Sequence, residues 1–356
     1  MAGNLKIRSR KDGAAVPLSA FDKQLLDAMQ GRFPLDPHPY ARVAAELGET
    51  EDVVLRRVQE LIDDRIIRQV TPIYDTRAFG YGSMLVAAKV DPEHPWGPAK
   101  IINAHPGVSH NYLRNHEFNM WFTIAVEEDS KLGLQGTLDV LAELTGAESI
   151  RQLPTLELFK IRMDLSMSGD SASLTSQGEI QEAAPAAPVA YDAFDQDVVR
   201  ATQGDLPVVS EPYAPAAAQL GITQEALVDH LAGMQERNLL RRVAAILFHR
   251  RAGFSANGMG VWQVPEDRIA EVGPRMAAFR GISHCYQRPT YPDWPYSVFT
   301  MAHGRSKDEC DAILDSIAEQ TGITERATLY SSTEFKKVRM LYFTDDFKRW
   351  EQEHAL

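Results

Sequence analysis

The stretch GVSHNYLRNHEFNMWFT (107–123) places polar side chains at every second position of a segment that otherwise has the composition of a β-strand. These side chains belong to His110, Tyr112, Arg114 and His116. Because residues two apart in a strand point to the same face of a sheet, two imidazoles, a phenol and a guanidinium are expected to lie together. The stretch GISHCYQRPTYPDWPYSVFT (281–300) repeats the pattern with His284, Tyr286 and Arg288. The second copy indicates that one structural plan occurs twice in the chain.

The duplication extends to the regions that precede these strands. PYARVAAELG (39–48) corresponds to PYAPAAAQLG (212–221), 173 positions later, and a segment with helical periodicity follows each of them. A short helix, a turn containing glycine and a second amphipathic helix predict a helix-turn-helix unit in each half. Thr50 and Thr223 are expected to cap the second helices. The alternating segments IRQVTPIYD and RRVAAILFH that come next are typical of a wing hairpin.

Each helix-turn-helix unit is followed by the order strand, helix, strand, strand, helix, strand. In the first half the predicted strands are 82–90, 107–115, 118–126 and 155–164, and the predicted helices are 94–105 and 130–145. In the second half the predicted strands are 258–265, 281–288, 296–303 and 328–341, and the predicted helices are 267–279 and 306–321. This order predicts an α+β fold of the ferredoxin-like (βαββαβ) type, with helices on one face of an antiparallel sheet. The uncovered faces of the two sheets are expected to pack together and form a pseudo-dimer within one chain. The two polar rows would then meet in a central cleft that holds either one or two active sites.

The predicted domains follow from this duplication and from a central segment rich in Ser, Ala, Gly and Pro, which is typical of a flexible linker. The predicted ranges are 1–16 for a flexible tail, 17–77 for the first helix-turn-helix domain, 78–164 for the first α+β domain, 165–190 for the linker, 191–250 for the second helix-turn-helix domain and 251–356 for the second α+β domain.

The composition is that of a globular protein. Of the 356 residues, 44% are hydrophobic and 24% are charged, and no apolar run approaches the roughly 20 residues that span a bilayer. The two cysteines, Cys285 and Cys310, have neither zinc-site spacing nor a disulfide framework, which favours a reducing cytoplasm. The net charge of −12 argues against a broad nucleic-acid surface, although a pocket can still be locally basic.

A winged helix-turn-helix followed by this α+β unit resembles the Lrp/AsnC family of transcription regulators. The two polar stretches, together with TLELFKIRM (155–163) and STEFKKVRM (332–340), look like the two subunit types of the siroheme decarboxylases, Lrp/AsnC-like enzymes of haem d1 and alternative haem biosynthesis. The form with Leu113 and Asn115 comes first, and the form with Trp294-Pro295-Tyr296 comes second. The resemblance implies loss of CO2 from two acetate side chains of siroheme, giving 12,18-didecarboxysiroheme, with no cofactor beyond this iron tetrapyrrole. The fusion favours the haem d1 route.

The histidines and arginines of the two rows suit that reaction. Decarboxylation leaves electrons that must enter the macrocycle, and the carbon must then receive a proton. Histidine is the commonest acid for such a step, so His110 and His284 are the candidate catalytic acids or close electrostatic partners of the acetates. Arg114 and Arg288 are candidates for holding carboxylates, and inter-sheet salt bridges are the structural alternative.

Two further histidines have open roles. His116, whose position in the second half falls at Thr290, is a candidate for an iron ligand or a second proton donor. His303 ends the predicted strand 296–303 and is an alternative axial ligand of the substrate iron. A structural role is the alternative for both.

Other side chains are candidates for binding the substrate. Tyr112 and Tyr286 offer a ring face and a hydrogen-bond donor. Trp294 and Tyr296 are expected either to stack on the edge of the macrocycle or to belong to the interface core. A basic rim, or alternatively a solvated strand face, is predicted from two matched pairs, Lys160 with Arg162 and Lys337 with Arg339.

Two other classes of function compete with the enzyme, namely a DNA-binding regulator and a haem carrier or sensor that uses the same cleft. The candidate recognition helices, 49–62 and 222–237, are both net acidic, which opposes binding to phosphates. We therefore expect the helix-turn-helix units to serve packing or dimer contacts. The expected protein partner is a homologous decarboxylase subunit or a second copy of the chain, and neither nucleic acid nor a membrane is an expected partner.

Overall fold

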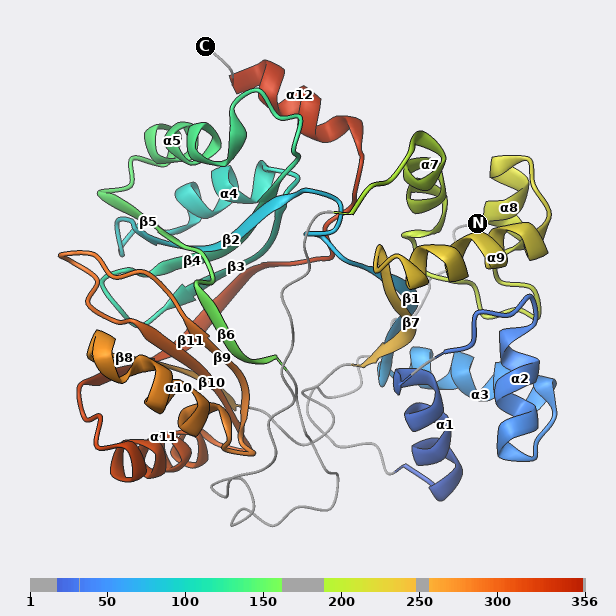
Figure 1. The fold of residues 1–356 in the computed structure, drawn as a ribbon, viewed down its shortest axis with the longest axis horizontal. Helices are drawn as coiled ribbons and strands as arrows, with labels where there is room; N and C mark the ends of the chain where they lie inside the picture. The colour runs from blue at the N-terminus through green and yellow to red at the C-terminus, as the bar shows by residue number, and fades with distance from the viewer. Residues whose placement is uncertain (1–17, 32, 162–188, 248–255, 355–356) are drawn as a thin grey trace, which may run out of the picture.

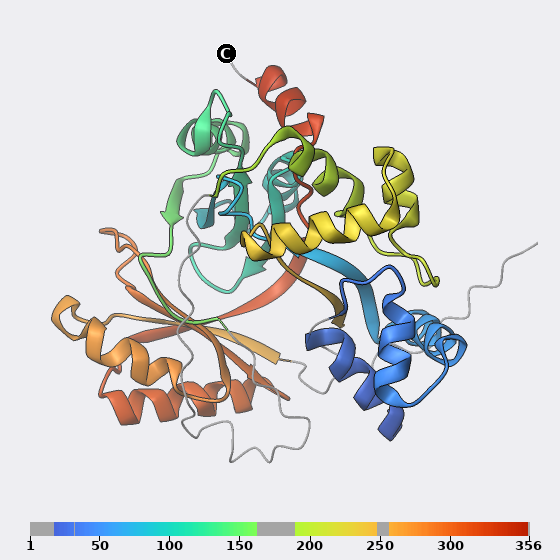
Figure 2. The same ribbon diagram turned by 45° about the vertical axis from the view of Figure 1, so that its right-hand side comes forward.

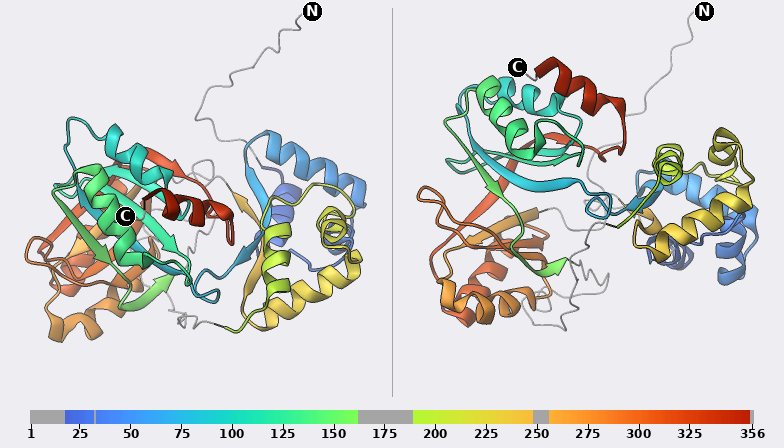
Figure 3. Two further views of the ribbon diagram at one scale, coloured as in Figure 1. Left: turned by 90° about the horizontal axis from the view of Figure 1, so that it is seen from above. Right: turned by 45° about the horizontal axis from the view of Figure 1, so that its top comes forward.

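The structure, a computed structural model, describes residues 18–31, 33–161, 189–247 and 256–354. The predicted tail 1–16, Arg162 and nearly all of the predicted linker 165–190 lie outside the described residues. The chain forms two lobes, one from both helix-turn-helix units and one from both α+β units (Figure 1 and Figure 3). None of the helices in the described ranges combines the length and apolar character that a membrane span requires.

The helix-turn-helix lobe contains matching helices from the two halves. They are α1 (Ala20–Gly31), α2 (Pro39–Leu47) and α3 (Glu51–Asp63) from the first half, and α7 (Ala193–Thr202), α8 (Ala214–Leu220) and α9 (Gln224–Glu236) from the second. Gly48 and Gly221 end α2 and α8 with φ of 70° and 68°, a left-handed conformation that glycine adopts without steric cost. Thr223 accepts a bond from the amide of Ala226 at 3.2 Å, whereas Thr50 makes no side-chain bond at α3, so only the cap at Thr223 is confirmed.

Within the described residues the two wing segments pair with each other instead of forming separate hairpins. β1 (Ile67–Tyr74) runs antiparallel to β7 (Leu240–Leu247), with Val70 opposite Ala245. Buried residues of both units form one continuous core around this ladder. The predicted wing hairpins are therefore wrong, because alternation identifies a strand and its faces but does not select the strand that pairs with it.

The α+β lobe contains the predicted elements and two that were not predicted. The first half supplies β2 (Gly82–Lys89), α4 (Trp96–Ala104), β3 (Val108–Arg114), β4 (Met120–Val126), α5 (Gly133–Thr145), β5 (Ser149–Leu153) and β6 (Glu157–Ile161). The second half supplies β8 (Ala256–Trp262), the 3-10 turn η2 (Glu266–Arg268), α10 (Ile269–Ala277), β9 (Ile282–Gln287), β10 (Val298–Gly304), α11 (Lys307–Thr321), β11 (Arg326–Lys337) and α12 (Asp345–His354). The elements absent from the prediction are β5 and α12.

The last strand of each half crosses into the sheet of the other half. The first part of β11, residues 326–330, pairs with β8, and residues 331–337 pair with β3 of the first half. In the first half this path is interrupted at Pro154, which cannot donate to a ladder: β5 pairs with its own β2, and β6 pairs with β9 of the second half. The strand predicted at 155–164 therefore completes the other half's sheet, and the strand order becomes β5-β2-β4-β3-β11-β8-β10-β9-β6.

The two halves of this sheet face each other, with helices on the outside. Helices α4 and α5 cover one outer face, and α10 and α11 cover the other (Figure 1 and Figure 2). Trp121 from the first half packs with Val261 and Phe299 from the second in a buried core between the sheets. The predicted α+β pseudo-dimer is thus confirmed. Helix α12 adds Trp350 to the outer core of the first half.

Candidate active site

The two polar rows lie on the inner face of the sandwich, as the alternation predicted. In β3 the Asn111 side chain donates to Asn103 of α4 at 3.0 Å, so Asn111 faces the helices and its neighbours in the strand face inward. In β9 Cys285 packs in the core beneath α10. The inward side chains make up a first site of His110, Tyr112 and Arg114 and a second site of His284, Tyr286 and Arg288.

Each site is completed by a strand from the other half. Arg114 Nη1 donates to the Leu329 carbonyl in β11 at 3.0 Å, and Arg288 Nη1 donates to the Leu153 carbonyl in β5. In the strand order β11, β8 and β10 separate β3 from β9. The exchanged strands therefore complete the two rows with different partners, and we describe the rows as two pseudo-symmetric sites.

The side chains within each site stack in the same way. The ring centroids of His110 and Tyr112 are 6.2 Å apart, and those of His284 and Tyr286 are 5.9 Å apart, with an interplanar angle of 30° in both cases. The guanidinium carbon of Arg114 lies 5.9 Å from the Tyr112 centroid, and that of Arg288 lies 4.8 Å from the Tyr286 centroid. Cations over ring faces are stabilised by the ring quadrupole, which helps to hold these guanidinium groups in place.

Arg288 is a buried cation, and Arg114 is half-buried with its Nε buried. Burial lowers the pKa of each, in both cases to about 10. Among the residues that the structure describes, neither Arg114 nor Arg288 forms an ion pair, so the inter-sheet salt bridge is not observed there. A buried guanidinium without a carboxylate is strongly stabilised when an anionic ligand supplies one, because two parallel N–H groups match a carboxylate.

A serine beside each histidine was missed in the sequence, although it stands in both quoted stretches. Ser109 Oγ lies 2.9 Å from His110 Nδ1, and Ser283 Oγ lies 2.6 Å from His284 Nδ1. A register shift in each strand brings the two neighbouring side chains together. The recurrence of Ser before His in both halves was the available signal. With Nδ1 held by serine, Nε2 is the ring nitrogen left for a ligand.

The histidines of both sites are held in the neutral form near pH 7. Burial lowers the pKa of His284 to about 4, and the positive charges of Arg288 and Lys160 add to the effect. Burial, Lys337 and Arg68 lower the pKa of His110 in the same direction. A neutral imidazole can still donate from its protonated nitrogen, so these rings act through their tautomer rather than through a cation.

A pH dependence of stability follows from His284. Its pKa is about 4 in the folded chain and near 6.5 in an unfolded one, so between these values the unfolded state binds more protons. The free energy of unfolding should therefore fall as the pH is lowered from about 6.5 to about 4. Urea unfolding at pH 7.5 and pH 5 should show a smaller loss for His284→Gln than for the unchanged chain. An equal loss in both would contradict this account.

The helix-turn-helix lobe adds positive charge that the prediction did not include in the site. Arg68 Nη2 donates to the Lys337 carbonyl at 3.3 Å, and its charge contributes to lowering the pKa of His110. The charge of Arg77 likewise contributes to lowering the pKa of Arg288. The charges of Arg77 and Arg241 oppose the rise that burial causes in the pKa of Tyr286. The match of Arg68 with Arg241 at the repeat spacing was the available signal.

The predicted basic rim is only partly present. Lys160 Nζ donates to the Phe279 carbonyl after α10 at 3.0 Å, so this side chain faces the helices and not a site. Its counterpart is Lys336, which donates to the Asn103 carbonyl at 2.7 Å. Lys337 instead pairs with His110 across the β3–β11 ladder and stays a candidate for the first site.

Arg339 also lies away from the rim. It donates to Thr71 Oγ1, and its other amino group lies 3.4 Å from Asp205 Oδ1, so it joins the two lobes. The pairing of Lys160 with Lys337 was therefore one residue out of register, which moves a side chain to the opposite face of a strand.

His116 and Trp294 meet outside the stacked rows. The His116 ring lies 5.2 Å from the Trp294 ring and 6.3 Å from the Tyr296 ring, and His116 Nδ1 accepts a bond from the Phe118 amide at 3.1 Å. Trp294 is fully buried in the core between the sheets, so it cannot stack on a macrocycle in this arrangement and belongs to the interface core. The roles of His116 and Tyr296 stay predictions.

His303 has both ring nitrogens engaged with protein groups. Its Nε2 lies 2.5 Å from Ser283 Oγ, and its Nδ1 lies 2.8 Å from Asn257 Oδ1. The predicted role as axial iron ligand is therefore corrected, because an iron ligand needs an available ring nitrogen. Within the described ranges no group of three or more His, Cys, Asp or Glu side chains is placed to hold a metal ion.

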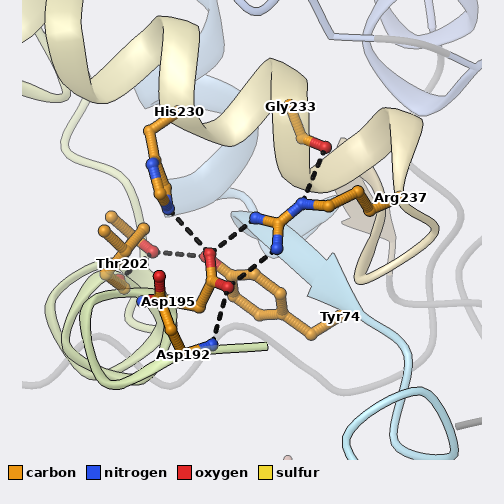
Figure 4. Close-up of polar contacts among 8 residues, drawn as sticks. Tyr74, Asp192, Asp195, Thr202, His230, Gly233 and Arg237 are labelled. Carbon is orange, nitrogen blue, oxygen red and sulfur yellow. Dashed lines mark hydrogen bonds and ion pairs between the residues drawn. The ribbon is translucent and has the colours of Figure 1, made fainter. Parts of the chain in front are cut away.

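The basic side chains of the helix-turn-helix units are partly used within the lobe. Figure 4 shows Asp195 held by Arg237, at 2.6 and 2.8 Å, and by His230 at 2.8 Å. In the first unit Arg57 grips Asp22 at 2.6 and 2.9 Å. In each candidate recognition segment one arginine thus forms an ion pair with a buried aspartate of the same lobe, which supports a packing role.

Family models match the chain in two copies. The model described as "Siroheme decarboxylase NirDL-like HTH domain" matches residues 22–68 and 195–241. The model described as "AsnC-like ligand binding domain" matches residues 78–160 and 251–336. The matched ranges repeat the order seen in the structure.

Similar proteins cover almost the whole chain. The siroheme decarboxylase of Hydrogenobacter thermophilus is 38% identical over 333 residues, which are 94% of this chain and 98% of that protein. A crystal structure described as siroheme decarboxylase NirDL in complex with an iron-uroporphyrin III analogue has a TM-score of 0.74 at 34% identity and covers 94% of this chain and 98% of that one. The siroheme decarboxylase beta subunit of Methanosarcina barkeri is 40% identical over 146 residues, 41% of this chain and 96% of that subunit. The chain therefore belongs to the siroheme decarboxylase family.

Proposed function

We propose that the chain is a siroheme decarboxylase that removes CO2 from two acetate side chains of siroheme and yields 12,18-didecarboxysiroheme. The observation that carries the proposal is an arginine with a lowered pKa in the same strand row as a serine-held, neutral histidine, in each of two sites. Siroheme carries many carboxylates and can supply the partners that the guanidinium groups require. The close relative named siroheme decarboxylase and the neighbour described with an iron-uroporphyrin III analogue support this choice of substrate.

Each site residue has a proposed part in the reaction. The bond between the methylene and carboxyl carbons of an acetate breaks, CO2 leaves, and the electron pair spreads from the methylene carbon into the macrocycle. His110 or His284 then donates a proton from Nε2, and the carbon becomes a methyl group. Arg114 and Arg288 hold neighbouring carboxylates, and Tyr112 and Tyr286 position both the histidine and the substrate.

The proposal extends to the setting of the reaction. The iron belongs to the substrate, and we propose that no further cofactor takes part. Cys285 and Cys310 are both free and buried, which fits a protein that works in the cytoplasm. A second copy or a homologous subunit is the proposed protein partner.

Anaerobic incubation of the purified chain with siroheme tests this function. We expect a product lighter than siroheme by two CO2, measured by mass spectrometry, while siroheme without protein stays intact. Siroheme that binds tightly and is recovered unchanged would contradict the enzyme and point to a carrier. Tight, salt-sensitive binding to a specific DNA duplex would instead point to a regulator.

A further inference from the structure

The second site has a hydrogen-bond chain behind its histidine. Ser283 Oγ lies 2.6 Å from His284 Nδ1 and 2.5 Å from His303 Nε2, and His303 Nδ1 lies 2.8 Å from Asn257 Oδ1. The chain crosses three neighbouring strands, β9, β10 and β8. Ser283 is 2% exposed and His303 is 8% exposed, so the path is shielded from bulk water.

The first site lacks this chain. Ser109 Oγ bonds His110 Nδ1 and reaches Thr123 Oγ1 at 2.8 Å, where a hydroxyl replaces an imidazole. The ladder registers place Ala125, paired with Ser83, at the position that His303, paired with Asn257, has in the second half. Alanine has no group that could hold or pass a proton.

We propose that His303, acting through Ser283, supplies the proton that His284 gives to the substrate, and that this supply is built into the second site alone. The inference rests on the proposed decarboxylation. His303 is a positioning residue in this scheme, because it acts on the substrate only through Ser283 and His284.

The proton path balances without any other reactant. Before transfer His303 carries protons on both nitrogens, Ser283 donates its hydroxyl proton to His284 Nδ1, and His284 carries its own proton on Nε2. As His284 Nε2 gives its proton to the methylene carbon, Nδ1 takes the Ser283 proton and Ser283 takes the His303 Nε2 proton. His284 is neutral before and after the step, and His303 becomes neutral with its remaining proton toward Asn257.

The charges around the second site explain why a donor behind His284 is useful. The charges of Arg288 and Lys160 add to the effect of burial and lower the pKa of His284. The charges of Arg77 and Arg241 also reach the neighbouring Tyr286, whose pKa they lower against the effect of burial. In this positive, buried setting His284 cannot store a proton as a cation near neutral pH. His303 differs from His284 because both of its ring nitrogens face oxygen acceptors, Ser283 Oγ and Asn257 Oδ1, and these bonds favour the ring with a proton on each nitrogen.

Two variants test the path, His303→Gln and Asn257→Asp. Glutamine can bond to Ser283 but cannot pass a proton, so kcat for CO2 release should fall about tenfold or more, with unchanged affinity for iron-uroporphyrin III in a spectroscopic titration. A carboxylate at position 257 stabilises the His303 cation, so the fall of kcat at high pH should move upward by about one pH unit. Thr123→Val removes the corresponding partner of Ser109 in the first site. In this variant the fall of kcat at high pH should occur at the same pH as in the unchanged chain.

The outcomes separate the path from the function. Wild-type kcat in His303→Gln, or a pH profile that Asn257→Asp does not move, would overturn the path while the unchanged enzyme still released CO2. If Thr123→Val shifted the pH at which kcat falls, the claim that only the second site has this proton supply would be overturned. Absence of CO2 release by the unchanged chain would instead overturn the proposed function.

Discussion

Replacing His284 by glutamine should lower kcat for CO2 release by about a hundredfold or more, because a positioned general acid contributes about 10²–10⁴ to a rate. Glutamine keeps a polar contact with Ser283, whose Oγ lies 2.6 Å from His284 Nδ1, but it offers no ring to carry a proton. His110→Gln should lose less, because no second imidazole stands behind Ser109. KM should change less than kcat, since the ring acts in the chemical step. Single-turnover measurement of the product masses under anaerobic conditions gives both values.

His94→Gln is the matched control for these variants. The His94 side chain is 80% exposed and pairs with Asp91 on the surface, so its replacement should leave the rate within about a factor of two. Full activity of both His110→Gln and His284→Gln would remove these residues as acids. Loss of activity together with loss of iron-uroporphyrin III binding would assign them to substrate binding instead.

Replacing Trp294 by alanine should cost about 3–5 kcal/mol in free energy of unfolding, the usual range for removing a large buried aromatic. The Trp294 ring is fully buried and lies 5.3 Å from the Trp121 ring of the first half and 6.0 Å from the Phe299 ring. The side chain therefore joins the two sheets, and its loss leaves a cavity between them. Urea unfolding of the chain, followed by circular dichroism, measures the change.

Trp96→Ala separates burial from the removal of a tryptophan as such. The Trp96 side chain is 68% exposed on α4 and contacts Phe335 with its edge, so its loss should cost less than about 1 kcal/mol. A similar small cost for Trp294→Ala, combined with weaker siroheme binding, would contradict the core role. That result would restore the predicted stacking on the macrocycle.

Much of the local structure could be predicted, because the same sequence pattern occurs in both halves of the chain. The recurrence of PYAxxAAxLG 173 positions apart identifies both helix-turn-helix units, and strand alternation places His110 and Arg114 on one face. Helix α12 and strand β5 were missed for different reasons. Helix α12 has no described counterpart in the first half, and β5 is a five-residue strand just before Pro154, too short for a clear pattern. Ser109 and Ser283 directly precede His110 and His284 in the two stretches, but they were not among the predicted site residues.

By itself the sequence determined the fold class, the two-fold repeat and the side chains that share a face, since these depend on residue type and period. Only the tertiary structure decided that β1 pairs with β7, that β6 and β11 exchange between the halves, and that the rows form two sites. The reason is physical: a ladder is built from backbone groups that nearly every residue carries, so a side-chain pattern sets the face of a strand but not its partner. The chain from His284 to His303 depends on that pairing, because it joins residues of three strands.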